Sequence, residues 1–379
     1  MFDSITPETL RAAGSVKWTA FPDTIGMFVA EMDFGVPPVV SECLRARADS
    51  GAMGYLPTHV AEDLREATAE YMASSFGWAV EPSSVYLFPD VLAVLRETLR
   101  RLVPEGPIVV PTPAYMPFLT LPAEEGRDLI EVPSRVEGGR WVLDYDGIDR
   151  ALSGGGLFVL CNPWNPVGRV LERDELTAIE EIVARNGATV FSDEIHAPHV
   201  FDGTHIPYAS LSDRAARHTI TATSTSKGWN TPGLKCAQMI VEGPFREAIA
   251  APAGLVERQI NTIGVEAATA VYRDSGDWLQ AVKAELDQRR RRVTDVINTI
   301  PGLSTVTPEG TYIAWIDASD LADRVESPVR LFRDHGVSLT DGAQCGEGYE
   351  NHLRLIFGTT GPILEEALAR MAAAVAGLD

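Results

Sequence analysis

The feature that most constrains the fold is an alternation, through the middle of the chain, of short apolar runs with amphipathic stretches of helical period. In one such stretch, Glu172–Asn186, the side chains of Leu176, Ile179 and Val183 share one helical face, and Gly187 follows in the place of a C-cap. Strands and helices in this order predict an α/β fold with a mostly parallel sheet, of the seven-stranded type, between helices. The expected strands are Ser84–Phe88, Ile108–Val110, Leu157–Cys161, Thr189–Ser192, Thr219–Ala222 and Gln238–Val241.

The last hundred or so residues have a different pattern, which predicts a smaller α/β domain. Its expected elements are a charged helix over Asp277–Thr299, strands over Tyr312–Ile316, Ser338–Thr340 and Leu353–Phe357, and a closing helix over Pro362–Ala376. A chain of 379 residues is long enough for two lobes. We therefore expect a large domain over residues 46–270 and a small domain over 271–379, with residues 1–45 joining the small domain.

Composition excludes several classes of function. The net charge of −21 argues against binding to nucleic acid or to an anionic membrane surface, because both need a basic face. No run approaches the roughly 18 apolar residues that span a bilayer, and no signal peptide is visible. The four cysteines are widely scattered, which suits neither a disulfide framework nor a zinc site. These features predict a cytoplasmic protein without a metal.

Lysine is rare in this chain, and one lysine stands in a suggestive place. Only four of the 32 basic residues are lysines, and Lys227 comes shortly after an expected strand in the run Thr223-Ser224-Thr225-Ser226-Lys227. A desolvated lysine amine can attack a carbonyl, which arginine cannot do. The neighbouring hydroxyls could donate to a phosphate. An ordinary solvated loop lysine is the alternative.

Two other polar motifs follow expected strands. Asp193, at the end of one strand, could pair with a protonated ring nitrogen, although aspartate also caps helices and turns. Asn165 lies in a run with two Asn-Pro pairs and could donate to a phenolate oxygen, although such a run also forms ordinary turns. Ligands of parallel sheets bind at the carboxyl ends of the strands, so a single coenzyme would explain all three motifs.

These motifs resemble those of the fold-type I enzymes that use pyridoxal 5′-phosphate (PLP), the aspartate aminotransferase superfamily, over nearly the whole chain. Within it the sequence is most similar to the MalY/PatB family of cystathionine β-lyase-like enzymes. The matching segments are Asn165-Pro166-Val167-Gly168, Ser192-Asp193-Glu194-Ile195-His196 and Ser224-Thr225-Ser226-Lys227. The resemblance implies that Lys227 carries PLP as a Schiff base, that Asp193 pairs with the pyridine nitrogen, and that Asn165 contacts O3′.

The same resemblance assigns roles to residues outside these motifs. Arg354 would bind the substrate α-carboxylate, and Tyr115 would stack on the ring near His196. The segment Val29–Phe34 resembles an N-terminal signature of the family, with Glu31 in place of the usual first aspartate. Tyr55 would reach the phosphate of the partner subunit, which implies a homodimer with shared active sites. The remaining implied phosphate neighbours are Ser224, Ser226, Lys235, Val91 and Leu92.

The implied reaction is the α,β-elimination of a thiol from cystathionine, cysteine or an S-substituted cysteine, catalysed by a carbon–sulfur β-lyase. An aminotransferase needs the same lysine, aspartate and arginine, so it remains the alternative, with a decarboxylating or deaminating variant on an S-conjugated amino acid behind it. The sequence departs from the family pattern at Val200, on the substrate side of its loop, and also at Gly228-Trp229 and Gly342–Gly346. These departures leave the coenzyme assignment intact and weaken the assignment of the substrate.

Overall fold

A seven-stranded sheet forms the centre of the computed structural model, which describes residues 5–103 and 105–378. The strand order is β2-β10-β9-β8-β7-β3-β4; β10 runs antiparallel to both of its neighbours, and the other pairs are parallel. This confirms the mostly parallel sheet. The strands are β2 (Val85–Phe88), β3 (Ile108–Thr112), β4 (Leu129–Pro133), β7 (Leu157–Cys161), β8 (Thr189–Asp193), β9 (Thr219–Thr223) and β10 (Ala237–Val241).

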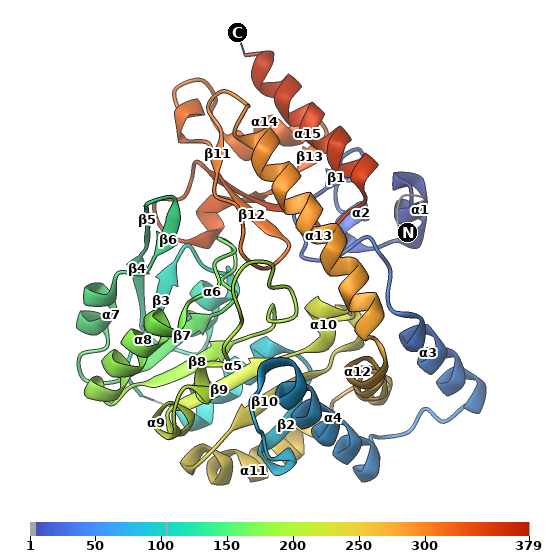
Figure 1. Ribbon diagram of the computed structural model, residues 1–379, viewed down its shortest axis with the longest axis vertical. Coiled ribbons are helices and arrows are strands. Elements are labelled where there is room, and N and C mark those ends of the chain that lie inside the picture. Colours follow the sequence, from blue (N-terminus) through green and yellow to red (C-terminus); the bar gives the residue numbers. More distant parts are fainter. Residues whose placement is uncertain (1–4, 104, 379) are drawn as a thin grey trace.

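Helices cover both faces of this sheet (Figure 1). On one face lie α5 (Val91–Glu97), α6 (Pro117–Glu124) and α11 (Pro244–Glu257). On the other lie α4 (Thr58–Phe76), α7 (Tyr145–Ala151), α8 (Arg173–Asn186) and α12 (Thr262–Asp274). Successive strand residues point to opposite faces, so that Leu157 packs toward α5 and α6 while Phe158 packs toward α7 and α8. Burial on both faces explains why these strands are continuous apolar runs.

Helix α8 begins and ends where its sequence predicts. Glu172 is the N-cap and forms a capping box with Glu175. Gly187 ends the helix in the left-handed conformation, with φ of 63°. Leu176, Ile179 and Val183 are buried against the sheet.

The C-terminal part of the chain forms a second, four-stranded antiparallel sheet of order β11-β12-β15-β14. Its strands are β11 (Ser304–Thr305), β12 (Ile313–Asp317), β15 (His352–Ile356) and β14 (Thr340–Asp341). Helices α13 (Gly276–Ile297) and α15 (Gly361–Ala376) pack side by side against it, and α14 (Pro328–Asp334) adjoins α15 (Figure 1).

The single strand expected over residues 338–340 is wrong, because this segment divides between two sheets. Val337–Ser338 forms β13, which pairs with β1 (Ile25–Gly26). Thr340 begins β14, in which it pairs with Arg354 of β15. The chain passes from one sheet to the other at Leu339, a change that the apolar pattern does not encode.

The N-terminal segment packs against the C-terminal sheet. It contains α1 (Pro7–Ala13), α2 (Val16–Thr19) and β1, and α3 (Pro38–Ser50) follows. The buried amine of Lys17 lies 2.8 Å from the buried carboxylate of Asp33, whose other oxygen accepts from the indole of Trp18. Trp18 and Met32 share an apolar core with α13 and α15. Residues 28–31 are thereby held between the two sheets.

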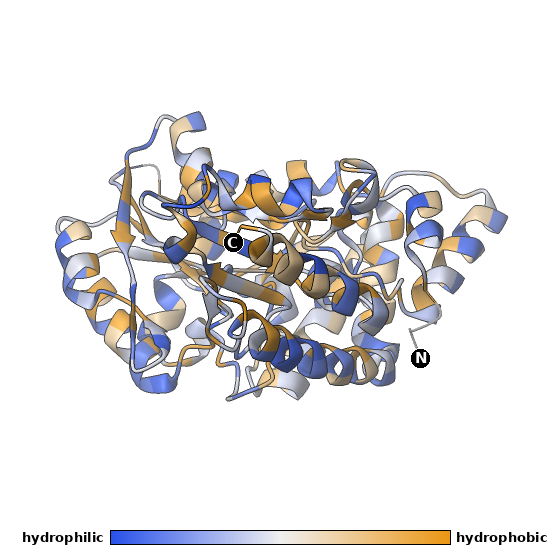
Figure 2. Ribbon diagram, turned by 90° about the horizontal axis from the view of Figure 1, so that it is seen from above, coloured by the Kyte–Doolittle hydropathy of each residue, from blue (hydrophilic) through white to orange (hydrophobic). Residues whose placement is uncertain are grey.

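Smaller elements complete the chain: the hairpin strands β5 (Arg135–Glu137) and β6 (Arg140–Val142), and the short helices α9 (Asp213–Arg217) and α10 (Thr225–Gly228). Figure 2 shows the apolar strands inside and the hydrophilic residues on the outer faces of the helices. Among residues 5–103 and 105–378, no helix combines the length and the apolar character that crossing a bilayer requires.

Candidate functional site

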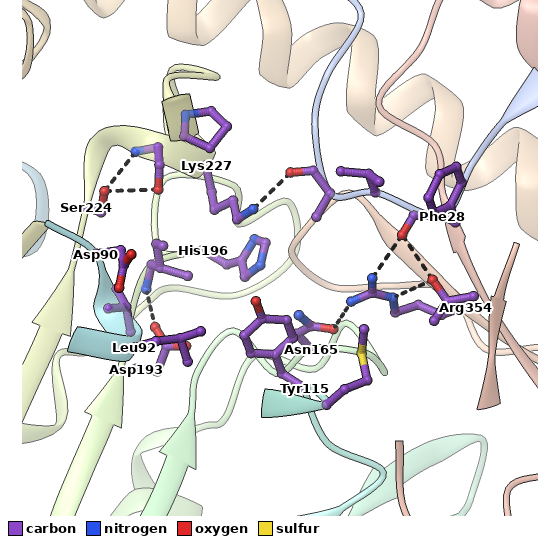
Figure 3. Close-up of a pocket in the computed structure, with 18 of the residues that line it drawn as sticks. Phe28, Asp90, Leu92, Tyr115, Asn165, Asp193, His196, Ser224, Lys227 and Arg354 are labelled. Atoms are coloured by element: carbon purple, nitrogen blue, oxygen red, sulfur yellow. Dashed lines mark hydrogen bonds between the residues drawn. The ribbon is translucent and has the colours of Figure 1, made fainter. Parts of the chain in front are cut away.

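A cavity of about 590 Å³ lies at the carboxyl ends of β7, β8 and β9, where the N-terminal segment and the C-terminal sheet close over them. Its volume is in the range of small-molecule sites. The side chains labelled in Figure 3 converge on it from seven separate parts of the chain. Of the residues predicted from the sequence, those that line it are Val91, Leu92, Tyr115, Asn165, Asp193, His196, Ser224, Ser226, Lys227, Lys235 and Arg354.

Lys227 lies on the one-turn helix α10, which Ser224 caps. The residue is partly exposed to the cavity, yet its amine lies deep enough that burial lowers its pKa to about 8, with a further contribution from Arg354. The amine donates to the main-chain carbonyl of Ala30 over 2.9 Å, and the hydroxyl of Tyr312 donates to the same oxygen over 2.9 Å. About one amine in ten is therefore neutral and nucleophilic at pH 7, far more than for an ordinary lysine.

Asp193 is the last residue of β8 and is buried. Burial raises the pKa of its carboxyl to about 7, although the N–H of Ile195, which donates to Oδ1 over 3.1 Å, opposes the shift. A cationic N–H placed beside this carboxyl would restore its charge. Asp193 is therefore well placed to pair with a protonated ring nitrogen.

Glu194 and His196, which follow Asp193 in the chain, have different tasks. The carboxylate of Glu194 points away from the cavity and accepts from the hydroxyl of Ser192, the N–H of Tyr208 and the ring of His205. It is therefore a structural residue of the core. His196 faces the cavity; burial and the charge of Lys227 lower its pKa well below the ordinary value, so its ring is neutral, and its buried Nδ1 has no partner among the described residues.

Arg354 lies on β15, so the C-terminal sheet also contributes a side chain to the cavity. Its Nη1 donates to Oδ1 of Asn165 over 3.3 Å, and its Nη2 donates to the carbonyl of Phe28 over 3.0 Å (Figure 3). Its Nε donates to the hydroxyl of Thr340 over 3.4 Å. A guanidinium has five N–H groups, so one hydrogen remains on each terminal nitrogen, which is the fork that a carboxylate accepts. Because its oxygen is engaged, the amide of Asn165 has its Nδ2 left to donate.

Hydrogen-bond donors gather at the opposite end of the cavity. Val91 and Leu92 open α5, where main-chain N–H groups have no partner within the helix. Ser226 lies beside Ser224, whose hydroxyl donates to the carbonyl of Cys236 over 2.7 Å. This arrangement suits a phosphate, with the amine of Lys235 nearby.

Asp90, for which no role was predicted, lies among these donors. Its Oδ1 accepts the N–H of Ala93 over 2.9 Å as the N-cap of α5. Its Oδ2 lies 3.1 Å from the amine of Lys235, in a pair that is partly exposed. A carboxylate at this position competes with any anion for the same donors.

Two predicted aromatic residues have different surroundings. Tyr115 lines the main cavity and makes an edge contact with Phe118 at 5.4 Å between ring centroids, and burial raises the pKa of its hydroxyl. Tyr55 is 92% exposed and lies outside the cavity, beside a separate surface hollow that Leu56 and Arg258 also line. Within a single chain, Tyr55 does not reach the site.

Sequence reasoning missed several groups that shape the site. The carbonyls of Ala30 and Phe28 belong to the main chain, so no side-chain motif could reveal them; only their proximity to the signature at 29–34 was a signal. Tyr312, Phe21 and Arg333 carried no recognisable pattern. Among the described residues, no group of three or more His, Cys, Asp or Glu side chains is arranged to hold a metal ion.

Comparison with known proteins identifies the family. The chain is 33% identical to cystathionine β-lyase of Corynebacterium glutamicum, over 96% of this chain and 98% of the relative. It is 31% identical to cystathionine β-lyase PatB of Bacillus subtilis, over 95% and 96%. The PLP-bound C–S lyase of Staphylococcus hominis superposes with a TM-score of 0.87 at 25% identity, over 96% of each chain. These likenesses confirm the predicted resemblance and fold. A family model, aminotransferase class I and II, matches residues 22–371, and the chain belongs to this family.

Proposed function

We propose that the chain is a PLP-dependent carbon–sulfur β-lyase that cleaves cystathionine, cysteine or an S-substituted cysteine. The observation that carries this proposal is the convergence of Lys227, Asp193, Asn165 and Arg354 on one cavity. Its relatives named cystathionine β-lyase and C–S lyase support the same reaction.

The residues present fit the coenzyme. Lys227 would hold it covalently, because its amine is buried and its pKa is lowered to about 8. Asp193 would pair with the ring nitrogen, and Nδ2 of Asn165 would donate to the phenolic oxygen. Tyr115 would stack on the ring, beside the neutral His196. The proposed phosphate neighbours are Val91, Leu92, Ser224, Ser226 and Lys235.

When bound, PLP supplies an aldehyde for the substrate amino group and a ring that accepts electrons from Cα. The protein supplies orientation and proton transfer. Arg354 binds the α-carboxylate with its two remaining hydrogens, and Lys227 removes the proton from Cα once its amine is free. Asp193 keeps the ring nitrogen protonated. The electron pair from Cα–H then expels the thiolate from Cβ, and water converts the remaining fragment to pyruvate and ammonia.

Transamination is the second candidate, because the family model that matches the chain describes aminotransferases. It needs the same residues, and Lys227 would return the proton it removes from Cα while no thiolate leaves from Cβ. The deciding experiment incubates the PLP-loaded enzyme with L-cystathionine, and separately with an amino-acid/keto-acid pair. Release of pyruvate and homocysteine at equal rates supports the lyase. Pyridoxamine phosphate accumulating without thiol release would overturn it.

The active form in this proposal is a homodimer with shared active sites. Tyr55 supports it, because a tyrosine that is 92% exposed, near the exposed Met53 and beside the hollow that Gly254 lines, is suited to a partner surface. Mixing inactive Lys227→Ala and Tyr55→Ala chains tests sharing, since one of the two sites in each hybrid would be complete. The four free cysteines support a cytoplasmic location. We keep the division 1–45, 46–270 and 271–379 as the proposed domain organisation.

A further inference from the structure

We propose that Arg333 is a specificity-determining residue that binds an anionic group at the far end of the S-substituent of the substrate. This inference rests on the proposed β-lyase function and names a substrate class for it: S-substituted cysteines that carry a distal carboxylate. The site lies in the main cavity, on α14, an element that carries none of the residues that would hold the coenzyme.

The first observation is the position of the Arg333 side chain. It lines the cavity although it belongs to α14. This helix is neither at the carboxyl end of a strand of the central sheet nor part of a coenzyme motif. The guanidinium carbon of Arg333 lies 4.6 Å from the ring centroid of Phe21, within the range of a cation–π contact. Phe21 also lines the cavity, so the contact holds the cation at the cavity wall.

The second observation is that the charge of Arg333 is not engaged. Among residues 5–103 and 105–378, its guanidinium has no carboxylate within 4.0 Å and no hydrogen-bond acceptor. Arg330, one turn earlier on the same helix, contrasts with it: Arg330 pairs with Asp334 at 3.7 Å and Glu326 at 4.0 Å. Arg333 is exposed to solvent and lines the cavity, so its guanidinium is available to bind an anion there.

Contacts connect this cation to the proposed α-carboxylate site. Arg354 donates to the carbonyl of Phe28, and the ring of Phe28 meets that of Phe21 edge to face at 5.2 Å between centroids. The ring of Phe21 in turn makes the cation–π contact with Arg333. Two guanidinium groups thus flank one stretch of cavity wall that is aromatic. A substrate with a carboxylate at each end and a thioether between them matches this arrangement, because each carboxylate can meet a guanidinium and the thioether can lie against the aromatic rings.

Two other polar residues of the cavity affect how well an anion would bind beside Arg333. Asp341 lines the same cavity, but one of its oxygens already accepts the N–H of Ala343 over 3.0 Å. Gln344 is neutral and can donate to an anion. A simpler role for Arg333, as a cation in the last turn of α14, would account for its charge but not for its place over Phe21 at the cavity.

The reaction itself is unchanged. Lys227 takes the proton from Cα, the Cβ–S bond breaks, and sulfur leaves with the bonding electrons. The thiolate then takes up a proton and carries the distal carboxylate away. One water converts the three-carbon fragment to pyruvate and ammonia. Arg333 touches none of the reacting atoms, so its effect should lie in KM and not in kcat.

The test compares two substrates of equal size, S-(2-carboxyethyl)-L-cysteine and its carboxamide, S-(2-carbamoylethyl)-L-cysteine. The PLP-loaded enzyme should turn over the carboxylate with a kcat/KM about fivefold or more above that of the amide, as expected for one partly exposed ion pair. Arg333→Gln should remove this preference by raising KM for the carboxylate, with the amide unchanged. The matched control is Arg330→Gln, which should keep the preference.

A binding measurement separates this inference from the proposed function. L-2-Aminoheptanedioate and its 7-amide replace sulfur with carbon and cannot undergo the elimination, so calorimetric titration reports their affinities directly. A preference for the diacid that Arg333→Gln removes supports the inference even if neither cysteine conjugate releases a thiol, an outcome that would reject only the lyase. Equal affinity of the wild-type enzyme for diacid and amide, or an equal loss for both in Arg333→Gln, would overturn it.

Discussion

The amine of Lys227 donates to the main-chain carbonyl of Ala30 over 2.9 Å, although the two residues are 197 positions apart. Ala30 belongs to the N-terminal segment that the buried Lys17–Asp33 pair holds against the C-terminal core. The position of the proposed nucleophile therefore depends on packing far from its own helix. Displacement of this segment would change the site without touching any residue of the coenzyme motifs.

Lys227→Ala should abolish covalent attachment of the coenzyme and turnover. The variant keeps the cavity, so PLP should still bind reversibly, but it has no amine to form the bond. Borohydride reduction followed by mass spectrometry of the intact protein should show the coenzyme mass on the wild type alone. Lys283→Ala is the matched control, because that lysine is partly buried outside the cavity. Retained turnover in Lys227→Ala would reject the assignment.

The rate of covalent attachment should rise with pH with a midpoint near pH 8 and level off above it. Only the neutral amine attacks an aldehyde, and burial lowers the pKa of Lys227 to about 8, so about one amine in ten is already neutral at pH 7. Glu31 opposes this shift by its negative charge. Glu31→Gln should therefore move the midpoint to lower pH. Stopped-flow absorbance of apoenzyme mixed with PLP at a series of pH values measures both midpoints; a wild-type midpoint near 10 would contradict the prediction.

Arg354→Lys should raise KM for L-cystathionine and lower kcat/KM by about 100-fold. A lysine keeps the charge but not the two parallel N–H groups, and it also loses the hydrogen bonds to Asn165 and Phe28. Steady-state kinetics of pyruvate release gives the values. Arg292→Lys, at an exposed pair with Glu365, is the control and should behave as wild type. An unchanged KM in Arg354→Lys would assign the α-carboxylate to another residue.

Asp90→Asn should tighten coenzyme binding several-fold. The substitution removes a negative charge beside the proposed phosphate donors and frees Lys235 from its partner, while asparagine remains a good N-cap for the N–H of Ala93. Equilibrium dialysis of PLP against apoenzyme gives the dissociation constants. Asp90→Ala separates the two effects, since it loses the cap as well. Weaker binding in Asp90→Asn would mean that the carboxylate orients Lys235 toward the phosphate.

Local chemistry explains which parts of the site were predictable. Lys227, Asp193 and Asn165 are polar residues next to buried strands, and the parallel sheet brings the ends of those strands together. Main-chain groups such as the carbonyl of Ala30 have no residue signature, and Arg333 reaches the cavity only through the packing of α14. Such contacts depend on tertiary structure.

The same distinction holds for the fold. The central strands β7, β8 and β9 are buried on both faces and read as apolar runs, and the prediction located each of them. The edge strand β4 (Leu129–Pro133) was missed because only one of its five residues, Val132, is buried and because it ends in proline. The change of sheet at Leu339 was missed because two short strands in succession look like one.

Removing one partner of the Lys17–Asp33 pair should destabilise the protein and disturb the site together. Both side chains are buried, so Asp33→Asn leaves the ammonium of Lys17 without a counter-charge, at a cost of about 3–5 kcal/mol. Replacing both, as in Lys17→Met with Asp33→Leu, leaves no unpaired charge and should cost less than Asp33→Asn alone. Urea unfolding followed by circular dichroism gives the free energies. Because the pair anchors the segment that carries Ala30, Asp33→Asn should also slow covalent attachment of PLP under conditions where the variant remains folded. A variant that loses stability but attaches PLP at the wild-type rate would show that the carbonyl of Ala30 does not position the amine.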